Sequence, residues 1–317
     1  MAKPAVILVG ADKGGVGKTT VSRTLLDYFA YRKIPVRAFD TEWPKGTLKR
    51  FHPDITDVVD VTAVPDQMKI FDTIESSGAQ VTLIDVRAGL MSPTLRALRD
   101  IGFLDMAKWN QMTFAVFHIL GPSIASLDEI AETAKFLVDA RYLLVKNFIN
   151  NTSFFDWDQT VYNSYFNKIP HAVEITVPKL SEMACEQVEI SSVPFATFIA
   201  NRKASGELAG NSFVLRGYVR HWLNSVWAEY DRVRLTDMLG LKDAAGPAAI
   251  SHAGVGAPAV PPVASPRDTP ARAAPAQDSS RKDTAPKEPA SKDSAPKETA
   301  AKEPAKPRQT AKVGELP

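Results

Sequence analysis

Short apolar runs alternate with longer segments of helical periodicity along the chain as far as Leu241. The runs predict strands, because they are bounded by turn residues and rich in β-branched side chains: Ala5–Val9, Val36–Phe39, Val81–Ile84, Thr113–Phe117, Tyr142–Val145 and Val173–Val177. The periodic segments predict helices: Lys18–Arg32, Met91–Ile101, Ser126–Asp139, Ser181–Val188 and Ser212–Val233. This alternation is typical of an α/β fold with a doubly wound, mostly parallel sheet covered by helices on both faces. Ligands on such a sheet bind beyond the carboxyl ends of its strands.

The composition changes abruptly near Ala244. The remainder is rich in Ala, Pro, Lys, Ser, Thr and Glu, lacks aromatic residues and carries 13 of the 23 prolines. A near-repeat follows, with Arg281–Ala290 resembling Ser291–Ala300. Such a segment cannot bury enough apolar surface to offset its ordering entropy. We therefore expect an α/β domain over residues 1–242 and a disordered tail over residues 243–317.

Charge and cysteine usage exclude several classes of site. The tail from Asp243 holds 11 of the 38 basic and 9 of the 36 acidic residues, which leaves 27 of each in the core. Any nucleic-acid contact therefore needs a local basic patch. Cys185 is the only cysteine, which excludes an internal disulfide and a multi-cysteine metal cluster. No apolar run approaches the ~18 residues of a membrane span and no signal peptide precedes the first strand. We expect a cytoplasmic protein without membrane insertion.

A glycine-rich segment connects the first strand directly to the first helix. Its backbone N–H groups and the helix N-terminus would converge on one point, which makes an anion site suited to phosphates. Lys18 is expected to reach the β- and γ-phosphates, and the Thr19 hydroxyl to ligate Mg²⁺. The segment therefore predicts a nucleoside triphosphate site built from Gly14, Gly15, Val16, Gly17, Lys18, Thr19 and Thr20.

The loop departs from the ordinary P-loop pattern at two positions. Asp12 stands where that pattern has glycine, and a second lysine, Lys13, begins the Lys-Gly-Gly-x-Gly-Lys-Thr-Thr segment. This deviant Walker A loop resembles that of the ParA/MinD family of ATPases. The resemblance implies ATP and Mg²⁺ as ligands, slow hydrolysis and an ATP-dependent homodimer in which Lys13 reaches the phosphates of the partner's nucleotide. We expect Asp12 to point away from the phosphates, because its charge would repel them.

Three acidic residues follow the ends of two further strands. The resemblance places Asp40 near Mg²⁺ and Glu42 near the attacking water, although for Glu42 a solvated acidic loop stays an alternative. The strand that closes on Asp85 has the Walker B arrangement, in which the carboxylate holds Mg²⁺ through water. Arg87, shortly after it, is interpreted either as a phosphate or interface contact or as a surface arginine paired with an acid.

Two residues near the ends of later strands are candidates for contacting the base of the nucleotide. Family members often read the base with an asparagine at the position of Asn147, and Pro178 matches the segment that shapes the adenine side. Asn150 and Asn151 stand close by and are the other candidates for this position. For Asn147 a further alternative is an asparagine that caps its own turn. The aromatic segment 154–166 is interpreted as buried helix packing, with partner recognition as its second reading. The resemblance covers roughly Ala2 to Val233 and is strongest in the glycine-rich loop.

Within the family, the chain looks closest to plasmid-partition and conjugal-transfer TraL-type members. That implies a dimerisation switch for intracellular positioning, plasmid or chromosome partition or DNA transfer, acting with an unidentified stimulating or cargo protein. Two alternatives stay open: a small-molecule ligase of the dethiobiotin-synthetase or CobQ type, and a degenerate nucleotide-binding adaptor. Lys13 favours the switch, because most such ligases need no lysine at that position.

Basic residues around the last helix are the candidates for nonspecific DNA contact. They would have to gather on one face of an ATP-bound dimer, and a solvated helix face with internal ion pairs is the alternative. The candidates are Arg202, Lys203, Arg216, Arg220, Arg232 and Arg234.

Overall fold

A computed structural model describes residues 3–120, 124–149, 172–241 and 250. The chain divides into two units, Met1–Ala259 and Val260–Pro317, and every described residue belongs to the first. The aromatic segment 154–166 and almost all of the expected tail lie outside the described residues. Their predicted roles therefore stay predictions, as does the expected boundary after residue 242.

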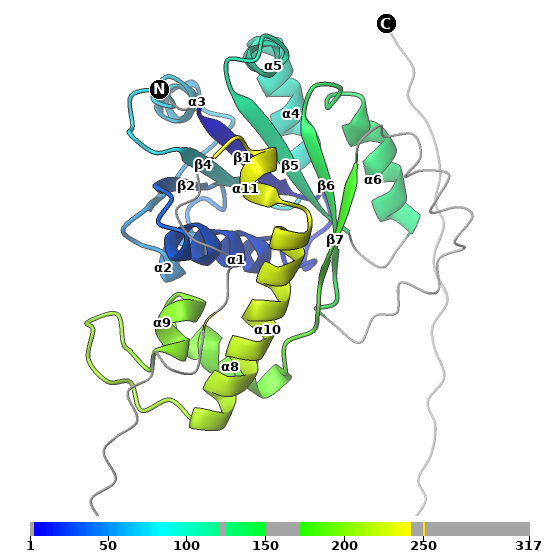
Figure 1. The fold of residues 1–317 in the computed structure, drawn as a ribbon. Helices are drawn as coiled ribbons and strands as arrows, with labels where there is room; N and C mark the ends of the chain where they lie inside the picture. Colours follow the sequence, from blue (N-terminus) through cyan, green and yellow to red (C-terminus); the bar gives the residue numbers. More distant parts are fainter. Residues whose placement is uncertain (1–2, 121–123, 150–171, 242–249, 251–317) are drawn as a thin grey trace, which may run out of the picture. The chain divides into compact units, whose positions relative to one another are not determined.

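Within the described residues, the core of the first unit is a seven-stranded sheet in the order β3-β2-β4-β1-β5-β6-β7 (Figure 1). Every strand pair is parallel, so the sheet is wholly rather than mostly parallel. All six expected strands are present, and the edge strand β3 was missed because three residues give no recognisable period. The strands are β1 (Ala5–Gly10), β2 (Val36–Asp40), β3 (Thr56–Val58), β4 (Val81–Asp85), β5 (Thr113–Leu120), β6 (Arg141–Asn147) and β7 (Val173–Val177).

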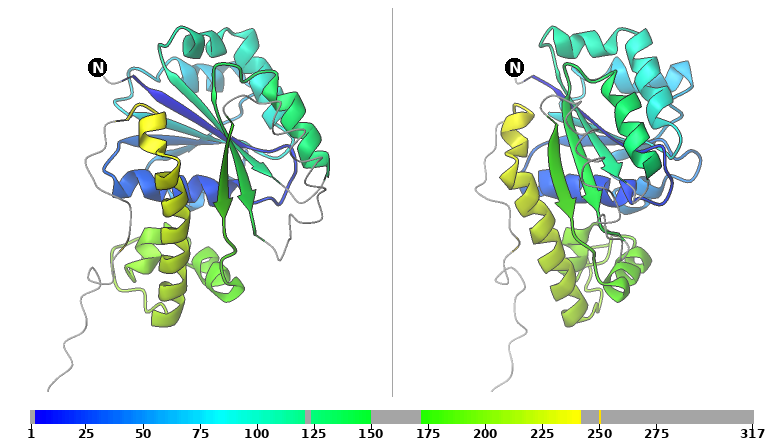
Figure 2. Two further views of the ribbon diagram at one scale, coloured as in Figure 1. Left: turned by 45° about the vertical axis from the view of Figure 1, so that its right-hand side comes forward. Right: turned by 90° about the vertical axis from the view of Figure 1, so that its right-hand side faces the viewer.

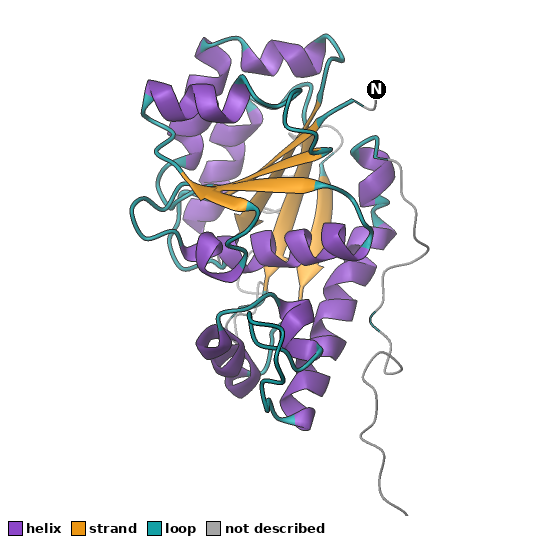
Figure 3. Ribbon diagram, turned by 90° about the vertical axis from the view of Figure 1, so that its left-hand side faces the viewer, coloured by secondary structure: helices purple, strands orange, loops and turns teal. Residues whose placement is uncertain are grey.

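Helices lie on both faces of the sheet (Figures 2 and 3). All five expected helices are present, with ends that differ by a few residues; the largest difference is α6, which ends at Ala134 rather than Asp139. The remaining helices are short and were not predicted. In chain order they are α1 (Lys18–Tyr31), α2 (Thr47–Phe51), α3 (Val64–Phe71), α4 (Met91–Asp100), α5 (Phe103–Lys108), α6 (Ile124–Ala134), α8 (Glu182–Ser191), α9 (Phe195–Ile199), α10 (Phe213–Arg232) and α11 (Leu235–Met238).

The two faces of the sheet build two separate hydrophobic cores. Successive side chains of a strand point to opposite faces, so Ile7 and Val9 pack with α1, α8, α9 and α10, whereas Val6 and Leu8 pack with α3, α4, α5 and α6. β1 is buried along its whole length because helices cover it from both sides. This explains why its sequence is a continuous apolar run rather than an alternating one.

The connections between strands reverse direction around β1. Helix α1 leads from β1 towards β2 on one side, and the segment with α4 and α5 leads from β4 past β1 to β5 on the other. Connections that diverge in this way leave a crevice at the carboxyl ends of the central strands. The glycine-rich loop lies there, directly after β1. The structure therefore has the doubly wound P-loop NTPase fold.

Candidate functional site

Two glycines of the loop after β1 have left-handed backbone conformations, Gly15 with φ 72° and Gly17 with φ 86°. Gly17 directly precedes α1, and a Cβ there would lie 2.2 Å from Asn147 Nδ2. The side chain of Lys18 is buried, and its Nζ donates a hydrogen bond of 2.9 Å to the Lys13 carbonyl. Burial lowers the pKa of Lys18, and nearby carboxylates, Asp85 first, oppose that shift. The loop is thus a closed turn with one buried cation.

The start of α1 and the end of β4 are joined by two hydroxyl groups. Thr19 Oγ1 donates to Asp85 Oδ2 at 2.8 Å and Ser22 Oγ donates to Asp85 Oδ1 at 2.9 Å. Burial, together with the charge of Asp40, raises the pKa of Asp85 to about 7, although the hydrogen bonds from Thr19 and Ser22 oppose that rise. Ser22 was not among the sequence candidates, although its spacing of one helical turn from Thr19 could have indicated it.

Asp40 holds the turn that carries Glu42. Asp40 Oδ1 accepts from the Glu42 N–H at 2.9 Å, and Oδ2 accepts from the N–H groups of Leu48 and Lys49, at 2.6 and 3.3 Å. Burial raises the pKa of Asp40, and these N–H bonds oppose that rise. Glu42 accepts a hydrogen bond from the Thr47 hydroxyl at the start of α2. Asp40 therefore positions the backbone from β2 into α2.

Two adjoining cavities lie at this edge of the sheet, and both are lined by Thr20 and Ile149. The first, of about 360 Å³, has both polar and apolar walls; it is lined by Gly15, Gly17, Lys18, Thr19, Thr20, Asp40, Glu42, Asp85, Val86, Arg87, Ala88 and Ile149. The second, of about 320 Å³, is mostly apolar; it is lined by Thr20, Arg23, Asn147, Ile149, Pro178, Leu180, Glu182, Cys185, Glu186, Val188, Glu189, Phe195 and Trp222. We call them the phosphate-side cavity and the base-side cavity after the residues that the sequence predicted for each.

The two base-side candidates come from neighbouring strand ends. Asn147 ends β6, and its Nδ2 donates to the Val16 carbonyl at 2.9 Å. This bond spans 131 residues to the glycine-rich loop, so Asn147 does not merely cap its own turn. Pro178 follows β7, and its carbonyl accepts from Trp222 Nε1 of α10 at 2.6 Å. Both residues thus border the base-side cavity from fixed positions.

Asp12 points away from the phosphate-side cavity, as expected. Its Oδ2 accepts from the Ser92 hydroxyl at 2.6 Å and its Oδ1 from the Ser92 N–H at 3.3 Å, so it bonds the first turn of α4. Its own N–H donates to Glu129 Oε2 of α6 at 3.1 Å, and its carbonyl accepts from the Gly89 N–H at 2.9 Å. Nothing in the local sequence indicated this role, because the partners come from two distant segments, the start of α4 with the turn before it and α6.

Lys13 and Arg87 are both exposed beside the phosphate-side cavity. Arg87 lines that cavity, and its N–H donates to Thr41 Oγ1 at 2.8 Å. Lys13 is not among the lining residues.

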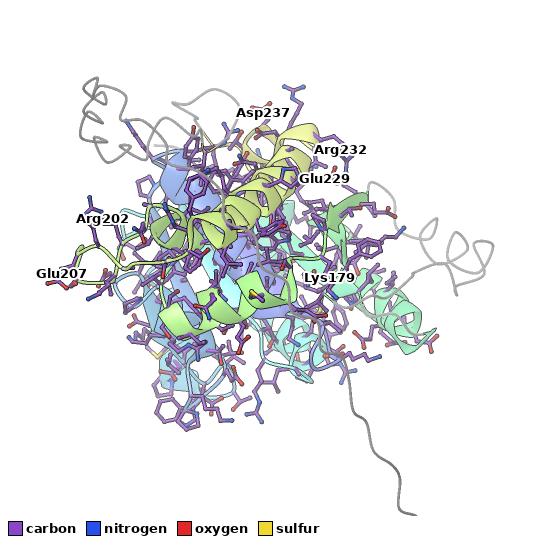
Figure 4. The ribbon with its side chains drawn as sticks, turned by 90° about the horizontal axis from the view of Figure 1, so that it is seen from below. Lys179, Arg202, Glu207, Glu229, Arg232 and Asp237 are labelled. Carbon is purple, nitrogen blue, oxygen red and sulfur yellow. The ribbon has the colours of Figure 1, made fainter. Side chains whose placement is uncertain are left out.

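The basic residues around α10, the last of the predicted helices, do not form a shared exposed face. Arg216 and Arg220 are buried, 7% and 4% exposed, where they cannot meet a phosphate backbone. The others bond to nearby acids or carbonyls: Arg202 to the Gly206 carbonyl, Lys203 to Glu207, Arg232 to Glu229 and Arg234 to Asp237. Figure 4 labels Arg202, Arg232 and the three acids.

Sequence reasoning missed two groups that line the base-side cavity, Arg23 and Glu189, and a third, Arg50, that pairs with one of them. Arg23 of α1 is buried, with its guanidinium carbon 3.4 Å from the centre of the Phe51 ring, and its Nη1 pairs with Glu189 at 2.5 Å. Glu189 also pairs with Arg50 of α2 at 2.5 Å. The residues come from three separate helices and follow no motif, so no sequence signal could have found them.

Within the described ranges, no cluster of three or more His, Cys, Asp or Glu side chains is arranged to hold a metal ion alone. In that part of the chain, no helix is long and apolar enough to cross a membrane.

No family model and no curated protein matches the chain. Solved structures do share features of its fold. An ADP-bound nucleotide-binding protein from Archaeoglobus fulgidus is 14% identical, with a TM-score of 0.38 over 58% of this chain and 85% of its own. The septum site-determining protein MinD of Pyrococcus horikoshii, with Mg-ADP, is 14% identical, with a TM-score of 0.41 over 69% of this chain and 95% of its own. The signal recognition particle 54 kDa protein of Aeropyrum pernix, with GDP, is 16% identical, with a TM-score of 0.39 over 75% of this chain and 50% of its own. At these values the likeness identifies neither a family nor a shared function.

Proposed function

We propose that the chain binds ATP with Mg²⁺ and hydrolyses it slowly. The observation that carries the proposal is the pair of adjoining cavities. One presents the buried cation of Lys18 beside two glycines with positive φ, and the other is apolar and bordered by Asn147. A triphosphate needs the first environment and a purine needs the second.

The metal would be held by Thr19 and Asp85. Hard oxygen donors suit Mg²⁺, which binds to proteins through one or two such groups together with phosphate oxygens and water. The carboxylate of Asp85 is buried and its pKa is raised, so a cation beside it would relieve the cost of its charge. When bound, Mg²⁺ neutralises phosphate charge and orients the phosphoryl group. Asp40 contributes by holding the turn and α2, since both of its oxygens already accept backbone N–H bonds.

Glu42 is the residue that we assign to water positioning. It is half-buried, lines the phosphate-side cavity and is oriented by the Thr47 hydroxyl. A carboxylate in that position can accept a proton from water or hold the water in line. Glu42→Ala should therefore keep ATP bound and lower the turnover number.

The binding half of the proposal is tested by Lys18→Ala. Removing this cation should weaken ATP binding by about 2 to 4 kcal/mol, measured by titration calorimetry, while the far-ultraviolet circular dichroism stays unchanged. Lys33→Ala is the matched control, because Lys33 is exposed beyond the other end of α1. Unchanged ATP affinity in Lys18→Ala would contradict the proposal.

We further propose that ATP joins two copies of the chain face to face. Lys13 is exposed beside the phosphate-side cavity without lining it, and a cation gains most where another copy's phosphates are not yet neutralised. Trp43, next to Glu42, is 58% exposed, and tryptophan is enriched in interface centres. Sedimentation of Glu42→Ala with ATP should show a dimer, and Lys13→Ala should bind ATP as a monomer. A monomeric Glu42→Ala protein with ATP bound would favour the small-molecule ligase instead.

The cellular role proposed for this switch is positioning, partition or DNA transfer, together with a cargo or stimulating protein. The buried and paired basic residues around α10 favour a protein cargo over direct DNA contact by this helix. Binding through phosphate contacts weakens steeply with salt. Retention of the ATP-bound protein on DNA at low salt, lost as the salt concentration rises, would therefore support direct DNA binding instead.

A further inference from the structure

The base-side cavity and the turn that carries Glu42 are connected by one carboxylate. Glu189 of α8 lines the base-side cavity. Its Oε1 pairs with Arg23 of α1 and its Oε2 with Arg50 of α2, each at 2.5 Å. Three helices that are distant in sequence therefore meet at a single side chain.

Helix α2 connects this carboxylate to the phosphate-side cavity. Its last residue, Phe51, is covered by the Arg23 guanidinium at 3.4 Å, and its first turn is held by Asp40, which accepts the Leu48 N–H at 2.6 Å. Asp40 also accepts the N–H of Glu42. Any movement of α2 relative to α8 would therefore act on the turn that holds Glu42.

The pairs of Glu189 are only partly shielded from water. The side chain of Glu189 is 43% exposed and that of Arg50 is 49% exposed, whereas Arg23 is 3% exposed. Ion pairs that are half hydrated contribute little, because water screens them. A base that fills the cavity would displace water from Glu189, and the same pairs become stronger in the resulting lower dielectric.

The buried side chain of Arg23 depends on Glu189 for its charge compensation. Its Nε and Nη2 are buried and have no hydrogen-bond partner in the described part of the chain, so Glu189 is the carboxylate that compensates this charge at hydrogen-bond distance. The ring of Phe195 also lies against the guanidinium, with its centre 4.2 Å from the guanidinium carbon. Arg23 is thus held in place, and of the two pairs it is the Arg50–Glu189 pair that has freedom to form and break.

We propose that Glu189 is a positioning residue that senses the base: a base in the cavity strengthens its pair with Arg50, fixes α2 and so holds Glu42 in place for hydrolysis. This inference rests on the proposed ATPase function and adds a route by which the base affects turnover. The phosphates alone would bind but would leave α2 less firmly held.

The direct test is backbone hydrogen exchange of residues 47–52, with saturating ADP compared with saturating pyrophosphate. The amides of Leu48, Lys49, Arg50 and His52 donate hydrogen bonds in this segment, so their exchange reports α2. In the wild-type chain ADP should slow this exchange at least about fivefold more than pyrophosphate does, which is the lower end of ordinary coupling. In Arg50→Met the two ligands should protect the segment equally, and Arg50→Lys should recover part of the difference.

Arg50→Met is chosen because it leaves the buried Arg23–Glu189 pair intact. Lys33→Met is the control: it likewise removes an exposed cation, but Lys33 lies beyond the far end of α1 and lines neither cavity, so the difference between ADP and pyrophosphate should persist. The turnover number for ATP divided by that for tripolyphosphate should likewise fall in Arg50→Met and persist in Lys33→Met.

Equal protection by ADP and pyrophosphate in the wild-type chain would overturn the inference, and so would a difference that survives in Arg50→Met. Failure of the ATPase proposal gives a different result, because then neither ligand would bind in calorimetry.

Discussion

The three glycines of the P-loop should respond differently to one and the same added methyl group. Gly17 has φ 86°, and an added Cβ would lie 2.2 Å from Asn147 Nδ2 and 3.1 Å from Ile149 Cδ1. Gly15 also has positive φ, 72°, but nothing lies within 4 Å of its Cβ position. Gly14 has no positive φ, and its Cβ would make an ordinary contact of 3.8 Å with Ala88. The series therefore separates backbone strain from steric conflict.

The magnitudes follow from these contacts. A left-handed conformation costs an alanine roughly 1–2 kcal/mol, which is the whole effect expected for Gly15→Ala. Gly17→Ala carries this strain and also displaces the Asn147 amide from the buried Val16 carbonyl, which adds about 1–3 kcal/mol. We expect Gly17→Ala to lower the free energy of unfolding by roughly 2–5 kcal/mol. Gly14→Ala should change it by less than about 1 kcal/mol in either direction.

Urea denaturation followed by tryptophan fluorescence measures all three variants, and a double-mutant cycle with Asn147→Ala tests the cause. Once the amide is removed, Gly17→Ala should cost only its strain, so the two changes should couple by about 1–3 kcal/mol. If Gly17→Ala costs no more than Gly15→Ala, or if the two changes are additive, the contact between Gly17 and Asn147 does not constrain this loop as argued.

Two further predictions concern the carboxylates of Asp27 and Asp12. Burial raises the pKa of Asp27 from 3.8 to about 7, so between these pH values the folded chain keeps a proton that the unfolded chain has lost. The proton that Asp27 keeps in the folded chain gives its full contribution to the free energy of unfolding below pH 3.8, the pKa in the unfolded chain. Above that pH the free energy of unfolding falls by about 1.4 kcal/mol per pH unit until the pH approaches 7. Asp27→Asn can still accept the Ala196 N–H but has no proton to lose, so its free energy of unfolding should fall less between about pH 5 and about pH 8 than that of the wild-type chain. Urea denaturation at both pH values measures this, and an equal fall in the two proteins would contradict the prediction. Asp12→Ala should lower stability by about 1 kcal/mol through lost bonds to Ser92, without weakening ATP binding in calorimetry; a marked loss of affinity would mean that Asp12 serves the phosphates.

Local patterns in the sequence were sufficient for the architecture and for naming side chains that line the phosphate-side cavity. Mostly apolar runs identified six of the seven strands in the described residues, and β1 is apolar at every position because both of its faces are buried. The run Gly14–Thr20 identified the loop between β1 and α1, because its glycines and the strand and helix beside it are all local features of the sequence. The same applies to Asp40, Glu42 and Asp85, which directly end or follow strands that meet at one edge of the sheet.

Contacts between distant segments decided the rest. The hydrogen bond from Asn147 to Val16 and the pair of Glu189 with Arg23 join residues 131 and 166 positions apart, and no pattern in either segment specifies its partner. Sequence spacing placed Arg216 and Arg220 one turn apart as a candidate DNA surface, yet packing buries both. A sequence states which side chains share a strand or a helix face, because that depends on local periodicity. Which face meets which depends on how helices and sheet pack together, and only the tertiary structure contains that information.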